Sequence, residues 1–191
     1  MQKKIVIGIA SFMLIFALAA CGKSNGSADH KNMDMDSKSV SSMNMDHMVH
    51  SSSGEVPKVL KVAKNPTYKV GDKVILKTDH MKGMMDAEAT ISGAFDTTAC
   101  VVNYTPTTGG PEVKNHKWVI QEEIKDAGDQ TLKPGTKVTL EADHMKGMQG
   151  AKGEIVTSEK TTVYMVDYTP TTGGPVVKNH KWVTEDEVTA K

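Results

Sequence analysis

An internal duplication constrains the fold of this 191-residue chain more than any other feature of its sequence. The block Thr78–Met84 recurs 64 positions later as Ala142–Met148, with alanine in place of the first threonine. The same offset repeats Tyr104–Pro111 as Tyr168–Pro175 and Asn115–Val119 as Asn179–Val183. Because no gap interrupts the offset, we expect two successive copies of one folding unit, residues 56–126 and 130–191, separated by a turn-rich junction.

Each copy has the pattern of short β-strands. Residues 71–77 and 135–141 start with glycine and then alternate apolar and polar side chains, which is typical of a half-buried strand. Further strands are predicted over 89–92, 99–104 and 116–119 and over their counterparts, and the acidic segments 121–124 and 185–188 predict one closing turn of helix each. We therefore expect an all-β protein of two tandem SH3-like small barrels, one per copy, because barrel closure removes exposed strand edges. Domains of this size are marginal alone, so the barrels should pack together and make their interface a candidate site.

The first twenty residues precede the predicted fold. Lys3 and Lys4 are followed by an almost uninterrupted apolar run over residues 5–20, which is typical of an export signal and short for a membrane-spanning helix. The run ends in Leu-Ala-Ala before Cys21 and resembles the lipobox of bacterial lipoproteins. This resemblance implies that Cys21 is acylated and anchors the chain to the cell membrane, on its extracellular face. An ordinary secretory signal or a signal anchor is the alternative.

Residues 21–55 are predicted to be a disordered tether, because they contain almost no aliphatic side chains to bury. Methionine and histidine are nevertheless frequent there, and the whole chain has 13 methionines. Side chains two residues apart point the same way in an extended chain, so alternating thioethers and imidazoles can chelate a soft metal ion such as Cu(I). The candidate tether ligands are Met33, Met35, Met43, Met45, His47, Met48 and His50. The alternative is a low-complexity spacer with incidental methionines.

The repeated loop His80–Met84 and its copy His144–Met148 form the first candidate site within the duplicated region. A single turn brings histidine and methionine side chains together, and glycine permits the positive φ that such a turn requires. The candidate ligands are His80, Met81, Met84, His144, Met145 and Met148. Asp79 and Asp143 are candidates for orienting the imidazoles. The alternative is a structural loop whose methionines plug the barrel end and whose histidine bonds a backbone carbonyl.

A second repeated block adds His116 and His180 as further candidate ligands. On a strand, His116 shares a face with Trp118, so a bound ion would lie near the indole ring. We expect both tryptophans to be core anchors, because the chain has only 5% aromatic residues. Cys100 is the only thiol besides Cys21, and its counterpart is Tyr164. A thiol required for function should occur in both copies, so we expect Cys100 to be buried.

The composition excludes several functions. The 23 Lys and Arg residues balance the 23 Asp and Glu residues, so the clustered positive charge typical of nucleic-acid binding is missing. The sequence contains no nucleophile elbow, zinc-protease helix or phosphate-binding glycine loop. We therefore expect a binding protein and no enzyme. The alternative to metal binding is a module that recognises cell-wall or other surface polymers through aromatic grooves, for which both copies offer only Trp118, Trp182, Tyr104 and Tyr168.

The repeated blocks Asp-His-Met-Lys-Gly-Met, Tyr-Thr-Pro-Thr-Thr-Gly-Gly and Asn-His-Lys-Trp-Val closely resemble the YdhK/CopL-like surface lipoproteins of Gram-positive bacteria. The resemblance extends over the lipobox, the Met/His-rich tether and both copies. It implies a membrane-anchored extracellular protein that binds copper and contributes to copper resistance beside a copper-exporting ATPase. The soft thioether donors favour Cu(I), with Ag(I) or Cu(II) as alternatives. The ligand positions named above are our inference from side-chain chemistry.

Overall fold

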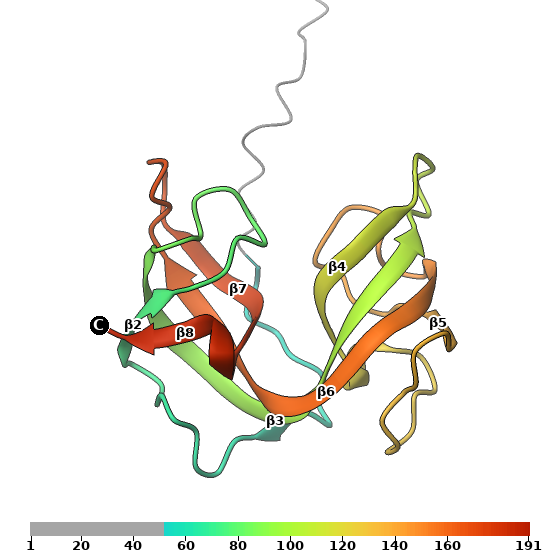
Figure 1. Cartoon of the computed structure of the whole chain (residues 1–191), viewed down its shortest axis with the longest axis horizontal. Helices are drawn as coiled ribbons and strands as arrows, with labels where there is room; N and C mark the ends of the chain where they lie inside the picture. Colours follow the sequence, from blue (N-terminus) through green and yellow to red (C-terminus); the bar gives the residue numbers. More distant parts are fainter. Residues whose placement is uncertain (1–51) are drawn as a thin grey trace, which may run out of the picture. The chain divides into compact units, whose positions relative to one another are not determined.

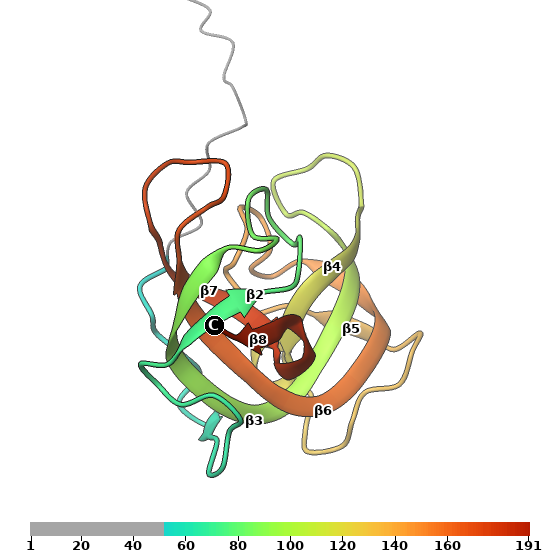
Figure 2. The ribbon, with the colours of Figure 1, turned by 60° about the vertical axis from the view of Figure 1, so that its left-hand side comes forward.

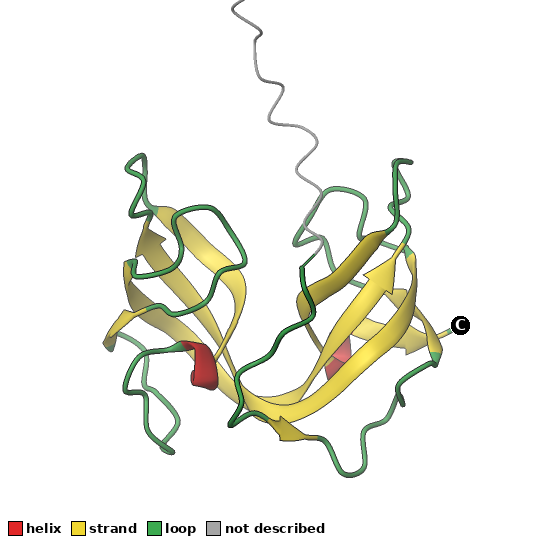
Figure 3. Cartoon of the chain, turned by 180° about the vertical axis from the view of Figure 1, so that it is seen from behind, coloured by secondary structure: helices red, strands yellow, loops and turns green. Residues whose placement is uncertain are grey.

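The computed structural model describes residues 52–191. The predicted signal segment, Cys21 and the seven tether ligands lie outside these residues, and so do the predictions made for them. The described elements are β1 (Lys61–Val62), β2 (Lys73–Leu76), β3 (Glu88–Thr105), β4 (Val113–Ile120), η2 (Gln121–Glu123), β5 (Lys137–Thr139), β6 (Lys152–Tyr168), β7 (Val177–Thr184), η3 (Glu185–Glu187) and β8 (Val188–Ala190). The all-β class is confirmed, and the two predicted helical turns are the 3-10 turns η2 and η3 (Figure 3).

Two long strands, β3 and β6, run through the whole folded unit and pair with each other (Figure 1). Their antiparallel register extends from Ala89 opposite Tyr168 to Thr105 opposite Lys152, with two irregularities. Near the middle, Thr97 lies opposite Thr161, which is its own counterpart in the second copy. The two copies are therefore related by an approximate two-fold axis that passes between these threonines.

The register of β3 and β6 divides the sheet into two lobes, each built from both copies. The β8 lobe contains β2, β7 and β8 with the first half of β3 and the second half of β6, and the β5 lobe contains β4, β5 and the remaining halves (Figures 1 and 2). The predicted arrangement of one barrel per copy is therefore wrong. The separate strands predicted over 89–92 and 99–104 are one strand, because residues 93–98 continue the pairing with β6 instead of turning back.

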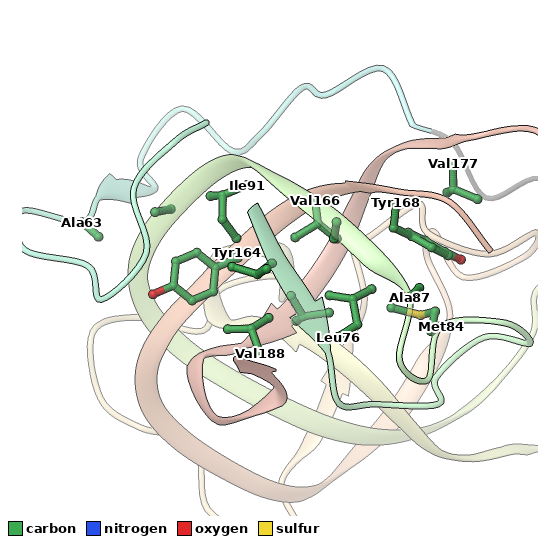
Figure 4. Close-up of a cluster of buried hydrophobic side chains, with 14 residues drawn as sticks. Ala63, Leu76, Met84, Ala87, Ile91, Tyr164, Val166, Tyr168, Val177 and Val188 are labelled. Carbon is green, nitrogen blue, oxygen red and sulfur yellow. The ribbon is translucent and has the colours of Figure 1, made fainter. Parts of the chain in front are cut away.

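Three apolar clusters hold this arrangement together. One lies in the β8 lobe around Leu76, Ile91 and Tyr164 (Figure 4), and a second lies in the β5 lobe around Val102, Leu140 and Ile155. The third joins the lobes and contains both Trp118 and Trp182. The tryptophans are core residues, as expected, and Cys100 is buried, as expected. No helix within residues 52–191 is long and apolar enough to cross a membrane.

Each His-Met-Lys-Gly-Met loop is held by the Thr-Pro-Thr-Thr-Gly-Gly turn of the other copy. The backbone N–H of Thr171 donates to Gly83 O, and that of Thr107 donates to Gly147 O, both over 2.9 Å. Gly83 and Gly147 have φ values of +83° and +79°. A Cβ atom on Gly147 would lie 2.6 Å from Thr108 Oγ1 and 3.2 Å from Thr108 N. These two repeated blocks are therefore the two sides of one contact.

We expect neither copy to fold alone, because each lobe core needs strands from both. A chain of residues 56–126 and a chain of residues 130–191 should each give the narrow amide dispersion of an unfolded protein in a proton–nitrogen NMR spectrum. Mixing the two should restore the dispersed spectrum of the intact unit. Dispersed spectra for either isolated copy would contradict the exchanged arrangement.

The loop contact predicts different costs for two alanine substitutions at positive φ. Gly109→Ala, where φ is +80° and no atom lies near the added Cβ, should lower the free energy of unfolding by about 1 kcal/mol. Gly147→Ala adds a steric clash, so it should cost roughly 1–3 kcal/mol more. Urea unfolding of both variants measures the difference, and equal costs would show that the turn does not clamp the loop.

Candidate metal site

A pocket of about 1020 Å³ lies between the lobes and is lined by residues of both copies. We call it the central pocket. The four histidines of the described region, His80, His116, His144 and His180, all line it. His80 and His144 lie in the two clamped loops, whereas His116 and His180 lie on β4 and β7. The four histidines predicted as candidate ligands therefore line one pocket, to which both copies contribute.

Two glutamates bind the loop histidines, and each comes from the opposite copy. His80 Nε2 lies 2.7 Å from Glu187 Oε1, and His144 Nε2 lies 2.8 Å from Glu123 Oε1. Both carboxylates lie in the 3-10 turns that follow β4 and β7. The pseudo-symmetry thus produces two equivalent Glu–His pairs, and neither pair is complete within a single copy.

The same glutamates also accept hydrogen bonds from the buried tryptophans. Trp118 Nε1 donates to Glu187 Oε2 over 2.8 Å, and Trp182 Nε1 donates to Glu123 Oε2 over 3.1 Å. Backbone N–H groups of Ile120 and Thr184 donate to the carboxylate three residues ahead. Each buried carboxylate is therefore surrounded by donors, which is the condition under which a charge can be buried.

These donors keep both glutamates ionised. Burial alone raises the pKa of Glu187, but the hydrogen bond and charge of His80, with the Thr184 and Trp118 donors, lower it to about 2. Burial likewise opposes ionisation of Glu123, and the charge and hydrogen bond of His144 lower its pKa. An ionised carboxylate only accepts hydrogen bonds. The Nε2 atoms of His80 and His144 are therefore the donors in these pairs, and in the neutral form of either imidazole the lone pair lies on Nδ1.

Three imidazole nitrogens around the central pocket are buried without a hydrogen-bond partner among residues 52–191: His80 Nδ1, His144 Nδ1 and His116 Nε2. Burial, followed by the charges of His144 and His80, lowers the pKa of His116 to about 4, although Glu123 opposes this shift. The His116 imidazole is therefore neutral at pH 7. A histidine whose other ring nitrogen donates to a carboxylate is the usual arrangement of a metal ligand.

The methionines of the loops fall into two groups. Met81 and Met145 are partly buried, line the central pocket together with the histidines, and pack against the two lobe cores. Met84 and Met148 are fully buried in the two lobe cores, and Figure 4 shows Met84 beside Leu76 and Ala87. The prediction that Met84 and Met148 are ligands is therefore wrong, because the fourth residue after each histidine turns into the core.

The predicted orienting residues also differ from those observed. Asp79 and Asp143 are exposed, and the imidazoles are bound instead by Glu187 and Glu123. Sequence reasoning treated these glutamates only as part of two acidic helical turns. One signal for them exists: within the segments 121–123 and 185–187, only the third residue is identical in both copies.

The described residues contain no group of three or more His, Cys, Asp or Glu side chains arranged to hold one metal ion. The central pocket instead offers imidazole nitrogens together with the thioethers of Met81 and Met145. This donor set suits a soft ion. The carboxylates of Glu123 and Glu187 do not add to this donor set, since histidine and tryptophan donors already occupy them.

Comparison with known proteins identifies relatives over nearly the whole chain. The model of a family described as a protein of unknown function, DUF1541, matches twice, over residues 70–121 and 134–185. The chain is 61% identical over 188 residues to the uncharacterized protein YdhK of Bacillus subtilis, covering 98% of this chain and 90% of YdhK. The resemblance to YdhK inferred from the repeated blocks is thus confirmed.

Two solved structures are similar to the described fold. A crystal structure of the DUF1541 family protein YdhK of Bacillus subtilis has a TM-score of 0.73 and 68% identity, covering 75% of this chain and 97% of that one. A solution NMR structure of the YdhK C-terminal domain has a TM-score of 0.62 and 71% identity, covering 65% of this chain and 94% of that one.

The lowered pKa of His116 predicts acid sensitivity of the metal-free protein. The unfolded chain binds a proton at an ordinary pKa of 6.5, whereas the folded chain binds it only near 4. The stability due to neutral His116 is therefore fully present above pH 6.5 and is lost progressively as the pH falls toward 4. In urea unfolding, His116→Gln should lose less stability than the unsubstituted protein over this range. Parallel pH profiles would contradict the assignment.

Proposed function

Because the chain belongs to the DUF1541 family, whose description assigns no function, we propose a function from the central pocket itself: the protein binds and buffers copper as Cu(I). The observation that carries this proposal is the set of three buried imidazole nitrogens without partners, on His80, His144 and His116. Two of these imidazoles are oriented by ionised glutamates. An unpartnered polar atom in a buried place is costly, and a bound ion removes that cost.

The donor chemistry favours Cu(I) over other ions. Thioether sulfur is soft and uncharged, and it selects Cu(I) over the carboxylate-binding cations. Met81 and Met145 carry such sulfurs and line the central pocket together with the loop histidines, which supports this choice. Ag(I) has the same preferences and is expected to compete, whereas Cu(II) would bind through the imidazoles. His180 lies on the same pocket wall and is an additional ligand candidate.

The cellular part of the proposal rests on the sequence. Acylation of Cys21 would hold the protein on the extracellular face of the cell membrane, and the seven tether ligands would provide a second, weaker binding region. Binding would lower free copper close to the membrane without catalysis. A copper-exporting ATPase in the same membrane is the proposed functional partner in copper resistance.

The burial of the aromatic side chains argues against the surface-polymer alternative. Recognition of a polymer by stacking needs exposed rings, but Trp118 is 6% exposed and Trp182 is fully buried. Tyr104 and Tyr168 are buried as well. The four side chains that this alternative requires in both copies are therefore in the cores, and we do not propose it.

Cu(I) titration of the folded region tests the proposal. A chain beginning at Ser52 is titrated under anaerobic conditions against a competing Cu(I) chelator, next to a chain beginning at Gly22. We expect both chains to bind Cu(I). The triple variant His80→Gln, His116→Gln, His144→Gln of the shorter chain should lose at least about tenfold in affinity, since even the residues that only orient metal ligands commonly contribute that much.

The two classes of methionine supply a matched control. Met81→Leu with Met145→Leu should weaken Cu(I) binding, because both thioethers line the central pocket. Met84→Leu with Met148→Leu makes the same chemical change in the same two loops, and it should leave the affinity unchanged, because those side chains lie in the cores. A shorter chain that does not bind Cu(I), or a triple variant that binds normally, would refute the pocket as the copper site.

A further inference from the structure

One segment of the folded unit leaves several apolar side chains in solvent. Val59, Val62 and Val70 are 74%, 72% and 66% exposed, and they are three of the five large apolar side chains that are exposed among residues 52–191. We call residues 58–70, which precede β2, the Lys/Val segment. A single exposed valine is ordinary on a protein surface, but three in one short segment indicate a surface that contacts something else.

The fold itself is held by other side chains of this segment. Leu60 packs in the cluster that joins the lobes, Ala63 packs in the β8-lobe cluster, and Tyr68 lies against that same cluster. Among residues 52–191, β1 pairs only with β3, so both of its residues, Lys61 and Val62, reach solvent. The exposed valines are therefore not what keeps the segment in place.

The Lys/Val segment is also strongly basic. It contains no acidic residue and four lysines, Lys58, Lys61, Lys64 and Lys69. All four lysines are exposed, and none of them has an ion-pair partner among residues 52–191. The segment thus presents unneutralised positive charge next to exposed apolar surface.

Three carboxylates border the segment without pairing with its lysine side chains. Asp96 is the cross-strand neighbour of Lys61. Asp72 Oδ2 accepts a hydrogen bond from the backbone N–H of Lys69, and Glu185 Oε1 accepts one from Thr67 Oγ1, both over 2.7 Å. The four lysines outnumber these neighbours, so the local charge stays positive.

The second copy supplies an internal comparison, because the offset of 64 aligns residues 122–134 with the Lys/Val segment. The two backbones match at the start, where Leu60 N donates to Pro57 O over 3.0 Å and Ile124 N donates to Gln121 O over 3.1 Å. They match again at the end, where residues 72 and 136 each donate to the carbonyl three residues before. Between these points they differ, since β1 pairs with β3 whereas Lys125 N donates to Thr139 O.

This comparison shows that the fold requires neither the exposed valines nor the basic charge. The positions that pack against the apolar clusters are apolar in both copies: Leu60 and Ile124, Ala63 and Ala127, Tyr68 and Leu132. The exposed valines, by contrast, correspond to Glu123, Asp126 and Pro134, and residues 122–134 contain four acidic residues and only two lysines. The exposed surface of the Lys/Val segment is therefore a property of the first copy alone.

We propose that the Lys/Val segment is a docking face for the surface of an anionic phospholipid bilayer. The lysine ammonium groups would lie at the lipid phosphates, and the exposed valines would enter the boundary between headgroups and acyl chains. Lysines alone would suit any polyanion. The valines favour a bilayer over a soluble anionic polymer, because only the bilayer offers an apolar phase in which to bury them.

Docking through this face would direct the central pocket away from the bilayer. Figure 1 shows residues 60–72 along the lower edge of the folded unit, below β3, whereas the loop that follows β2 lies at the upper side. That loop contains His80 and Met81, which line the central pocket. The docking depends neither on copper nor on the proposed acylation of Cys21, and it can therefore be tested without either.

Vesicle sedimentation of metal-free protein tests the docking. The chain beginning at Gly22, which lacks the acylated cysteine, is mixed with vesicles of equal parts phosphatidylglycerol and phosphatidylcholine, or of phosphatidylcholine alone, with a metal chelator present. We expect binding to the anionic vesicles that is at least about tenfold stronger than binding to the neutral ones, because each lysine near an anionic surface contributes to the attraction.

The duplication provides a matched pair of lysine variants. Lys61→Gln with Lys69→Gln should weaken binding to the anionic vesicles at least about tenfold. Lys125→Gln with Lys133→Gln makes the same change at the equivalent positions of the second copy and should leave binding unchanged.

A valine pair tests the apolar part of the docking. Val59→Ser with Val62→Ser should weaken binding at least about fivefold, whereas Val176→Ser, at an exposed valine outside the segment, should not alter it. All of these variants change exposed side chains, so urea unfolding should match that of the unsubstituted chain and confirm that each variant is folded.

Three results would overturn the proposal. The first is equal binding to anionic and neutral vesicles, or none. The second is an equal loss for the two lysine pairs, which would show general attraction of a cationic chain. The third is a loss for the lysine pair without a loss for the valine pair, which would assign the face to a soluble polyanion. Cu(I) binding is measured separately and decides only the copper proposal.

Discussion

The antiparallel pairing of β3 with β6 is the constraint on which the rest of the structure depends. Because Thr97 lies opposite its own counterpart Thr161, the residues before Thr97 pair with those after Thr161, and the residues after Thr97 pair with those before Thr161. Each of the two strands therefore contributes one half to each lobe. Every later feature follows from this crossing. The loop of one copy meets the turn of the other, and the glutamate of one copy meets the histidine and tryptophan of the other.

The two buried glutamates, Glu123 and Glu187, position the histidines of the central pocket across the two copies. A carboxylate in a nearly water-free position is stable only when donors surround it, and Glu123 and Glu187 each satisfy that requirement with an indole, an imidazole and a backbone amide. The carboxylate thereby fixes the orientation of each imidazole, and its Nδ1 atom has no hydrogen-bond partner among residues 52–191. The same contact that ties the copies together thus also prepares the nitrogen that we propose as a ligand.

Local sequence pattern was sufficient to predict the duplication, the all-β class and the two single helical turns. It also predicted the burial of Cys100 and of the tryptophans. Each of these predictions depends on short-range periodicity or on comparison of the two copies. It was insufficient for the exchange of strands, since alternation shows that residues 89–92 and 99–104 are extended but not which strand they pair with. Met84 failed as a ligand for a related reason. Its spacing from His80 fits a single turn, but tertiary packing directs its side chain into the core.

Duplication also explains why the central pocket is not symmetric. Thr78 Oγ1 donates to Glu187 Oε1 over 3.1 Å, whereas Ala142 at the equivalent position has no hydroxyl to give to Glu123. The entering segment is hydrogen-bonded to β7 through Ser52 and Glu55, and it cannot make the same bonds to β4 at the same time. The approximate two-fold symmetry is therefore broken where this single entering segment meets the fold. Identical residues such as His116 and His180 consequently differ in burial.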